Sequence, residues 1–274
     1  MSEDARAAAD SPLVSLDHPV PGVAVVTLNR PRSLNSINDA LAAEMATTFT
    51  QLATEATVSV VIVTGAGRGF SSGADLTALG AGIGAEGTQL RLDPMVDWMR
   101  WVARPYVALN RLPQLTIAAV NGPAVGAGWG LAMGCDIRIA DPSASFCATF
   151  VRMGLGPDYG LSRTLPDTIG QARALELLAT GRTVDSTEAL RLGLISAVAD
   201  DVMAAAMSLA EAMVTAPGHA IRSLKQTVRR SSNADLTTVI DEVEATAQAE
   251  LFAHPDFHAS AAAWLSRFQA DATA

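Results

Sequence analysis

The chain has 274 residues and 49% of them are hydrophobic, so either one large domain or two small ones can bury a substantial core. Its formal net charge of -9 excludes the basic surface that nonspecific binding to nucleic acid or to an anionic membrane requires, and a small ligand is the better expectation. The two cysteines have no Cys/His cluster around them, which predicts reduced, buried thiols and no metal site.

The N-terminal residues, MSEDARAAAD, are acidic and rich in alanine and lack the basic flank of a secretory signal, so we expect a cytoplasmic protein. The longest apolar stretch, residues 115–140, is long enough to span a bilayer. It contains Asn121, Pro123, Asp136 and Arg138, which argue against a membrane span. We therefore expect this stretch in the protein interior.

In chain order, residues 1–12 have nothing to bury and predict a loose tail. Runs of β-branched and apolar residues that end at turn residues predict four strands, at residues 22–29, 58–64, 115–120 and 136–140. Helical patterns predict helices at residues 39–56 and 89–112. The Gly/Ala-rich residues 77–86 predict a surface loop, and such loops often cover ligands.

After Gly170 the pattern becomes almost wholly helical. It predicts helices at residues 171–180, 186–192, 201–215, 217–230 and 234–252, and a last piece that ends at residue 270. The expected fold class is therefore α/β, with a core over residues 13–195 that contains the ligand site and a helical C-terminal region over residues 196–274.

Two motifs in the chain are misleading. Gly82–Gly87 matches the GxGxxG pattern of dinucleotide sites, but no strand precedes it and Glu86 would face a pyrophosphate. Gly69–Gly73 matches the GxSxG pattern of a nucleophilic serine, here Ser71. A serine hydrolase also needs a late histidine, and the late histidines of this chain lie in a helical tail with no strand before them. A plain turn, in which the serines donate hydrogen bonds, is the favoured interpretation.

Two short segments of small residues follow predicted strands, and they suggest a site for a negatively charged oxygen. Gly73-Ala74-Asp75 and Gly126-Ala127-Gly128 lack bulky side chains, so their main-chain N–H groups can approach a ligand closely. The second segment also opens a predicted helix, where N–H groups have no partner within the helix. Two such turns can converge on one oxygen.

Four segments in order match one known family. They are Leu28–Asn35 (LNRPRSLN), Gly67–Leu76 (GRGFSSGADL), Ala118–Gly128 (AAVNGPAVGAG) and Cys135–Ala140 (CDIRIA). With them, and over about residues 14–230, the chain resembles the enoyl-CoA hydratase/isomerase (crotonase) superfamily. The resemblance implies a crotonase-like fold of repeated ββα units, an acyl-CoA substrate, and no cofactor apart from the coenzyme A within that substrate.

The resemblance also implies the roles of individual residues. The main-chain amides of Ala74 and Ala127 correspond to the two oxyanion-hole donors, and Gly126 and Gly128 flank the second donor. The adenine and pantetheine groove corresponds to Ser33, Leu34, Ser72, Asp75 and Leu76. Lys225 matches a family lysine near the CoA phosphates, but it could equally be a solvated lysine on a helix.

The chain departs from the family's hydratases, which activate water with two glutamates. Gly130 and Phe150 stand at those two positions. Asp158 matches the aspartate of the members that shift double bonds, although its place after Pro157 also suits a turn residue. Burial near Phe150 and Trp129 would raise the pKa of this carboxyl group toward the working pH.

The expected function is therefore double-bond migration in an enoyl-CoA, with Asp158 as acid and base. Enoyl-CoA hydratase activity, thioester hydrolysis and acyl-CoA binding without chemistry stay open as alternatives. The resemblance further implies a homotrimer or homohexamer, in which the C-terminal helices contribute to oligomerisation and to closure of the CoA site.

Overall fold

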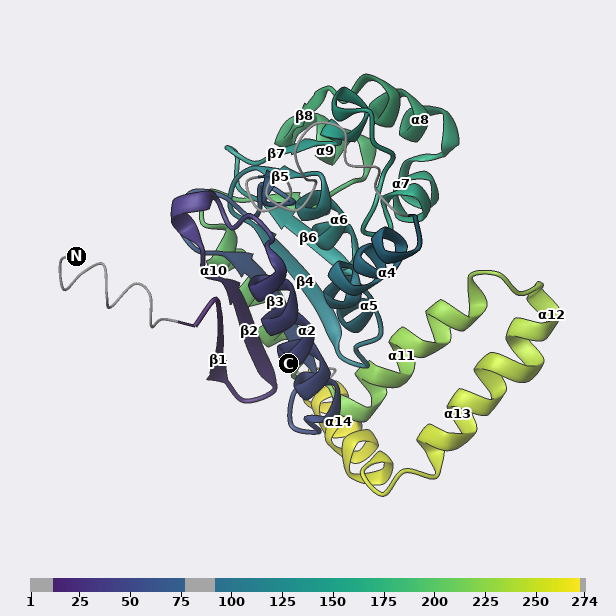
Figure 1. Cartoon of the computed structure of the whole chain (residues 1–274). Helices are drawn as coiled ribbons and strands as arrows, with labels where there is room; N and C mark the ends of the chain where they lie inside the picture. Colours follow the sequence, from purple (N-terminus) through teal and green to yellow (C-terminus); the bar gives the residue numbers. More distant parts are fainter. Residues whose placement is uncertain (1–11, 77–91, 272–274) are drawn as a thin grey trace, which may run out of the picture.

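The computed structural model describes residues 12–76 and 92–271 (Figure 1). Its central element is a six-stranded sheet in the order β1-β2-β3-β4-β6-β9. The strands are β1 Val14–Val20, β2 Val23–Leu28, β3 Val60–Gly65, β4 Leu115–Val120, β6 Ile137–Ala140 and β9 Ala197–Val198. β1 is antiparallel to β2, and every later pair is parallel. The four predicted strands are thus the four central ones, and the predicted α/β class is confirmed.

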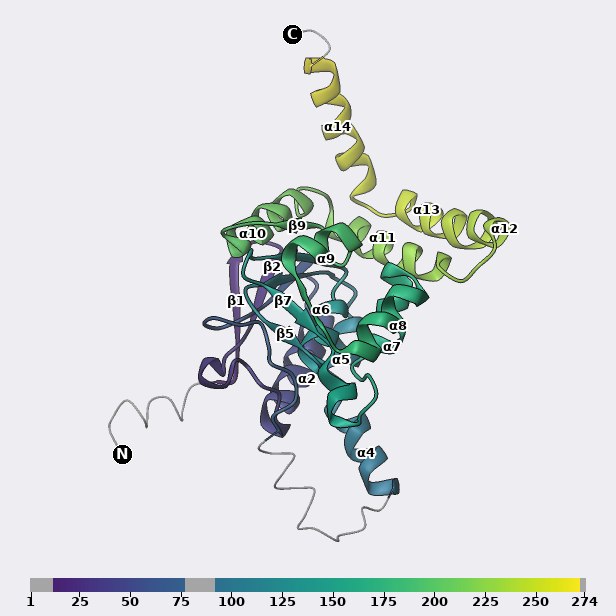
Figure 2. The ribbon, with the colours of Figure 1, turned by 90° about the horizontal axis from the view of Figure 1, so that it is seen from above.

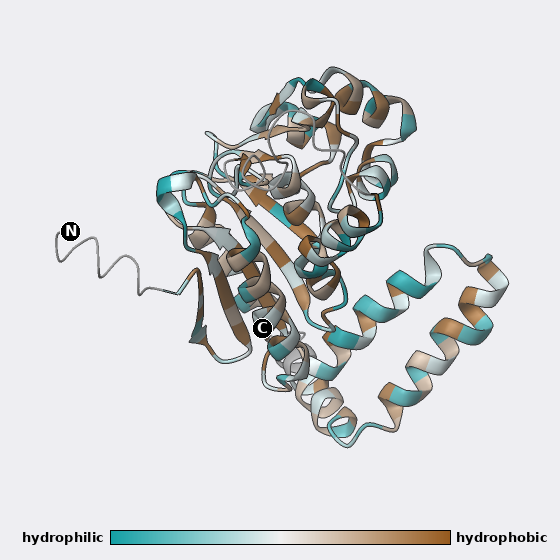
Figure 3. Ribbon diagram, in the orientation of Figure 1, coloured by the Kyte–Doolittle hydropathy of each residue, from teal (hydrophilic) through white to brown (hydrophobic). Residues whose placement is uncertain are grey.

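The central strands are buried on both faces, which explains why they form continuous apolar runs. In β2, Ala24, Val26 and Leu28 face one apolar core, while Val23 and Val25 face another. The first core is covered mainly by α2 (Asp39–Thr54), α5 (Arg104–Asn110) and α6 (Ala127–Met133), and the second by α10 (Val202–Met213). Figure 1 shows α2 and α5 on one side of the sheet with α10 behind it, and Figure 3 shows the central strands mostly in the apolar colours.

A second sheet, β5-β7-β8, extends the core beyond the first one. It consists of β5 Ala124–Val125, β7 Ser145–Cys147 and β8 Thr183–Asp185. Next to it lie η2 (Thr149–Met153, a 3₁₀ helix), α7 (Leu161–Ile169), α8 (Gln171–Thr180) and α9 (Ser186–Leu192). The bounds of α8 and α9 are those that the sequence predicts. The short strands, β1 and α7 are not among the predicted elements.

The predicted helix over residues 89–112 is interrupted. The described part forms α4 (Leu92–Val102) and α5, with Ala103 between them. The interruption at Ala103 lies two residues before Pro105, which has no N–H to donate to the preceding turn and so suits the first turn of a new helix. The predicted loop at residues 77–86 and the Gly82–Gly87 motif lie outside the described residues.

The C-terminal region is helical, as predicted. It contains α11 (Gly218–Ser231), α12 (Leu236–Thr238), a π-helical stretch η3 (Val239–Glu244), α13 (Ala245–Phe252) and α14 (Phe257–Asp271). Figure 2 shows α14 projecting away from the rest of the chain. β9 and α10 lie after residue 195 and pack on the main sheet, and the predicted division into residues 13–195 and 196–274 stays a prediction. Among the described residues, no helix combines the length and the apolar character that a membrane crossing needs.

A buried ion cluster attaches α11 to the main sheet. The ammonium group of Lys225 lies 2.6 Å from a carboxylate oxygen of Asp136 and donates to the carbonyl oxygen of Gln114. Arg229 contacts the other oxygen of Asp136 at 2.9 Å, and the backbone N–H and the hydroxyl of Thr116 donate to the first. Lys225 is only 4% exposed, so the interpretation as a solvated lysine is wrong. Burial lowers the pKa of its ammonium group, which Asp136 opposes.

We expect Lys225→Met to lower the free energy of unfolding by about 3 kcal/mol, because it leaves Asp136 buried with fewer partners. Arg230→Met, on the exposed side of the same helix, should change this free energy by less than about 0.5 kcal/mol. Urea denaturation of both variants measures the difference. Equal effects would show that the ion cluster is not needed to attach α11.

Candidate active site

The first candidate oxyanion donor lies in the turn after β3. The N–H of Ile37 donates to Gly73 O at 2.7 Å, and the N–H of Asp75 donates to Ile37 O at 2.9 Å. These two bonds form a parallel bridge between Ile37 and Ala74. Gly73 and Asp75 both bond to Ile37, and the residue between them, Ala74, turns its own N–H to the other side of the strand. The amide of Ala74 therefore points away from Ile37.

The second candidate donor begins α6. Gly126 has a φ of 52°, and its own N–H donates to Cys147 O at 2.8 Å. Ala127 is the first residue of the helix, so its N–H has no acceptor within the helix. Across the described residues, no acceptor receives the N–H of Ala74 or of Ala127. Both amides are thus available to a ligand.

The two turns pack directly on one another. A Cβ atom on Gly73 would lie 2.4 Å from Val125 O and 3.3 Å from the amide nitrogen of Ala127. A Cβ atom on Gly128 would lie 2.3 Å from Ser71 O. Any side chain at these positions would push the turns apart, because the contacts with Val125 O and Ser71 O are far shorter than ordinary van der Waals distances. The glycines of the two motifs are therefore required by packing.

The residues predicted to line the CoA groove also lie together. Ser72 connects the turn after β3 to the 3₁₀ helix η1 (Pro31–Ser33): its N–H donates to Leu34 O at 2.8 Å and its hydroxyl donates to Ser33 O at 3.1 Å. Asp75 accepts from Arg30 at 3.0 Å and from the hydroxyl of Ser36 at 3.2 Å. Leu76 follows and is 57% exposed.

Arg30 is a site residue that the sequence analysis did not single out. Its guanidinium group binds Asp75 and also donates to the carbonyl oxygen and hydroxyl of Ser36, so it joins the residues before α2 to the turn after β3. Its position inside the Leu28–Asn35 motif was the available signal. The pattern alone could not show which way a long, flexible side chain turns.

Asp158 lies in a tight turn before α7. Its carbonyl oxygen accepts from Leu161 N at 3.0 Å, so the predicted turn role is confirmed for its backbone. One carboxylate oxygen is buried and has no hydrogen-bond partner among the described residues. Burial raises the pKa of this carboxyl group from 3.8 to about 6, because the charged form loses water, and a hydrogen bond from its own backbone opposes this only in part. A turn residue with no other task would not need its carboxylate buried in this way.

Tyr159 connects Asp158 to α6. Its hydroxyl donates to Val102 O and its ring meets Tyr106 edge to face at 6.2 Å. A Cβ atom on Gly130 would lie 2.4 Å from the Cβ of Tyr159 and 2.7 Å from its carbonyl oxygen. Tyr159 therefore occupies the space that any side chain at position 130 would need, one turn of helix after Ala127.

The buried ring of Phe150 lies at the start of the same helix, beside Gly126. Its nearest ring atoms would be 3.6 Å from a Cβ atom on Gly126. From Phe150 an open groove of about 620 Å³ extends between η2, α7 and α8, and it reaches Gly156 and Pro157 just before Asp158. Its lining is largely apolar and consists of Phe150, Val151, Leu155, Gly156, Pro157, Ser162, Pro166, Gln171, Ala174, Leu175, Leu178 and Ala179.

Two other candidate residues have structural contacts that occupy their side chains. Ser71 is fully buried, donates to Asn35 O at 2.8 Å and accepts from Gly73 N at 3.2 Å, so it supports the turn and is not an exposed nucleophile. Lys225 points into the ion cluster with Asp136, where a CoA phosphate would have to compete for its ammonium group. Cys135 and Cys147 are free and buried, as predicted, and burial raises the pKa of the Cys135 thiol to about 12.

Comparison with known proteins agrees with this geometry. The family model for enoyl-CoA hydratase/isomerase matches residues 20–272. The probable enoyl-CoA hydratase EchA14 of Mycobacterium tuberculosis is 37% identical over 224 residues, which cover 82% of this chain and 83% of that protein. The 1,2-epoxyphenylacetyl-CoA isomerase of Escherichia coli is 37% identical over 228 residues, covering 82% and 86%. A relative named as a hydratase and one named as an isomerase thus have the same sequence identity to this chain.

Solved structures show the same fold. The enoyl-CoA hydratase of Bacillus anthracis superposes with a TM-score of 0.86 at 31% identity, covering 93% of this chain and 96% of that one. A protein of Thermobifida fusca that was crystallised in complex with CoA superposes with a TM-score of 0.79 at 32% identity, covering 92% and 96%. The predicted crotonase-like fold is therefore confirmed.

We expect Gly73→Ala to destabilise the chain by about 2 kcal/mol more than Gly193→Ala, because of the added overlap with Val125 O. Both glycines have a φ near 80°, but a Cβ atom on Gly193 would meet nothing within 4 Å, so this second variant isolates the cost of backbone strain. Thermal unfolding of the two variants provides the comparison. An equal loss of stability in the two variants would mean that the two turns can move apart without cost.

Asp158→Asn should raise the free energy of unfolding at neutral pH. Because the folded-state pKa of Asp158 is raised, its burial costs stability as pH rises from 3.8 to about 6, and the full cost applies above that range. The free energy of unfolding of the variant should therefore exceed that of the native chain by at most about 3 kcal/mol at pH 7 and by little at pH 4. Denaturation at both pH values, with the exposed Asp200→Asn as control, tests this. A gain that does not depend on pH would contradict the assigned cause.

Proposed function

The chain belongs to the enoyl-CoA hydratase/isomerase family, and from this premise we propose that it shifts a carbon–carbon double bond in an enoyl-CoA thioester. The observation that supports this proposal most directly is the buried carboxylate oxygen of Asp158, which has no hydrogen-bond partner among the described residues. A single acid/base group suffices for migration of a double bond, whereas the family's hydration route requires two carboxylates.

The proposed reaction begins with the thioester carbonyl. Its oxygen accepts hydrogen bonds from the amides of Ala74 and Ala127, which have no acceptor among the described residues. These bonds strengthen as negative charge develops on the oxygen, and each such donor typically stabilises the transition state by roughly 2.7–4 kcal/mol. Since the packing of Gly73 and Gly128 holds both amides, they need little reorganisation when the charge appears.

Proton transfer is assigned to Asp158. Its carboxylate removes a proton from the acyl chain, and the electron pair of that C–H bond moves through the conjugated system to the carbonyl oxygen as a dienolate. The protonated Asp158 then returns the proton to a different carbon, and the carbonyl forms again. A pKa of about 6 suits both steps, because the group is a base at neutral pH and an effective acid once protonated.

Two surfaces fit the two ends of the substrate. Ser33, Leu34, Ser72, Asp75 and Leu76 lie along consecutive turns beside Ala74 and would hold the CoA portion. The groove that begins at Phe150 would accept an apolar acyl group, since its lining is largely apolar and it continues to the residues before Asp158. That a similar protein of Thermobifida fusca was crystallised in complex with CoA supports the binding of a CoA substrate by this chain.

Enoyl-CoA hydration is the second candidate, and it is favoured by the names of EchA14 and of the Bacillus anthracis enzyme. Against it stands the packing around α6. Tyr159 fills the space of a side chain at position 130, and Phe150 supplies an apolar ring where the family's hydratases have a second carboxylate. Thioester hydrolysis or binding without chemistry would follow if neither migration nor hydration is found.

We also propose that the chain forms a homotrimer or homohexamer. Several large apolar side chains of the C-terminal helices are exposed in the single chain, and a second copy could cover them. They are Leu224, Val228, Leu236, Ile240, Phe252, Trp264 and Leu265.

Asp158→Asn should lower the rate of double-bond migration by at least about 100-fold, because it removes the proton acceptor and leaves the oxyanion donors in place. The measurement uses a panel of 2-enoyl and 3-enoyl thioesters and follows both migration and exchange of acyl-chain protons with solvent. In the native chain, kcat/KM should rise with pH through about 6, as the carboxyl group loses its proton.

Asp200→Asn is the matched control, since Asp200 is an exposed aspartate that follows the edge strand β9, and it should retain full activity. Migration that survives Asp158→Asn would end the assignment of the base. Hydration that survives the same change would point to a different water-activating group and favour the hydratase.

A further inference from the structure

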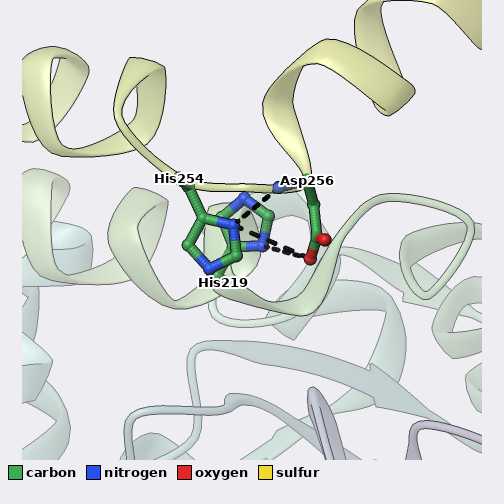
Figure 4. Close-up of side chains that lie close together, drawn as sticks. All are labelled: His219, His254 and Asp256. Carbon is green, nitrogen blue, oxygen red and sulfur yellow. Dashed lines mark hydrogen bonds and ion pairs between the residues drawn. The ribbon is translucent and has the colours of Figure 1, made fainter.

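A second cluster of chemically active side chains lies far along the chain from the proposed active site. It combines His219, the second residue of α11, with His254 and Asp256 from the turn between α13 and α14 (Figure 4). The two imidazole rings stack with centroids 3.5 Å apart and planes inclined by 10°. We propose that these three residues bind a divalent transition-metal ion of the Zn²⁺ class, which attaches the start of α14 to α11.

The spacing of the possible ligand atoms suits such an ion. The Nδ1 atoms of His219 and His254 lie 3.9 Å and 3.7 Å from one carboxylate oxygen of Asp256, and one ligand atom from each residue lies within 4.8 Å of the others. Two ligands bound tetrahedrally to Zn²⁺ at about 2.1 Å lie roughly 3.4 Å apart. An imidazole nitrogen binds a metal in the plane of its ring, so the two rings must rotate out of their stacked arrangement for both to reach one ion, with solvent as a fourth ligand.

The protonation pattern of His254 gives the second argument. Its Nδ1 accepts a hydrogen bond from the backbone N–H of Asp256 at 3.3 Å and therefore has no proton of its own. An unprotonated nitrogen and a carboxylate oxygen thus face each other across 3.7 Å, although both are acceptors. A cation that replaces the long hydrogen bond from Asp256 N–H would be shared by both acceptors, and an unprotonated imidazole nitrogen is the form that binds metals.

The choice of metal follows from the ligand types. Two imidazoles and one carboxylate are typical of Zn²⁺ and related transition ions, whereas Ca²⁺ and Mg²⁺ prefer sets made of oxygen ligands only. The sequence alone indicated no metal site, because His219 lies far from His254 and Asp256 along the chain. These ligands come from segments that meet only through the fold.

The position of the cluster indicates what a bound ion would do. The start of α11 is held against the core, since a Cβ atom on Gly218 would lie 2.4 Å from the hydroxyl oxygen of Ser59 and Arg222 donates to Val58 O at 2.9 Å. α14, by contrast, projects away from the body of the chain (Figure 2). An ion shared by His219 and the 254–256 turn would therefore fix the direction in which α14 leaves the core.

The test uses the full chain without a histidine tag and titrates Zn²⁺ in competition with a chromophoric chelator. We expect one tightly bound Zn²⁺ per native chain and an affinity at least about tenfold lower in each of His219→Gln and His254→Gln. His258→Gln is the matched control, because His258 is an exposed histidine in the same region, and its affinity should stay within about twofold of native. An equal loss in all three variants, or no stoichiometric binding to the native chain, would overturn the proposal.

A second measurement separates metal binding from folding defects. Amide hydrogen exchange over residues 257–266 should slow when Zn²⁺ is added to the native chain, and should not change in Asp256→Asn, which alters only an exposed carboxylate. Slowing of equal size in both proteins would show that Zn²⁺ acts elsewhere. Neither readout depends on the proposed isomerase activity, so the two proposals can fail independently.

Discussion

The close approach of the turn after β3 to the turn after β4 is the constraint on which the proposed site depends. Gly73 and Gly128 allow contacts that no side chain would permit, and parallel pairing of β3 with β4 aligns the carboxyl ends of both strands at one edge of the sheet. The amides of Ala74 and Ala127 are direct products of this packing. The same edge receives η1 from β2, so the residues assigned to the CoA tail lie beside the two donors without needing a separate domain.

A carboxyl group that loses much of its hydration, with one oxygen unpartnered among the described residues, is a cost that the fold must offset elsewhere. Asp158 lies in a turn where the backbone is already demanding, since Tyr159 has a φ of 47° although it is not a glycine. Tyr159 is held by its hydroxyl bond to Val102 and by its packing against Gly130. The small residue at position 130 therefore has two consequences: it makes room for Tyr159, which supports the turn of Asp158, and it removes a position from which a hydratase-type carboxylate could act.

The sequence predicted long apolar strands and helices well and short elements poorly, for physical reasons. β2, β3, β4 and β6 are buried on both faces and appear as unbroken apolar runs, but β5 and β9 have only two residues each, too few for any period. In α7, Leu161, Leu165 and Ile169 form a buried stripe at helical spacing that Pro166 disguises, since proline within a helix normally breaks it. Motif glycines located both proposed donor turns in advance. The partners of Arg30, Lys225 and His219 could not be predicted, because long-range pairing depends on the fold rather than on local spacing.

α11 links the site-bearing sheet to the projecting helices. Figure 3 shows it mostly in hydrophilic colours, so apolar burial contributes little to holding it, and its attachment depends on specific polar contacts. Arg222 binds the chain just before β3, and Lys225 and Arg229 share Asp136, which also holds Thr116 of β4. These contacts lie at the starts of β3 and β4, the two strands that lead toward the proposed donor turns. Any partner or ion that orients α12–α14 would act on the sheet through α11. The charged contacts of α11 near β3 and β4 resist movement of this helix relative to the sheet.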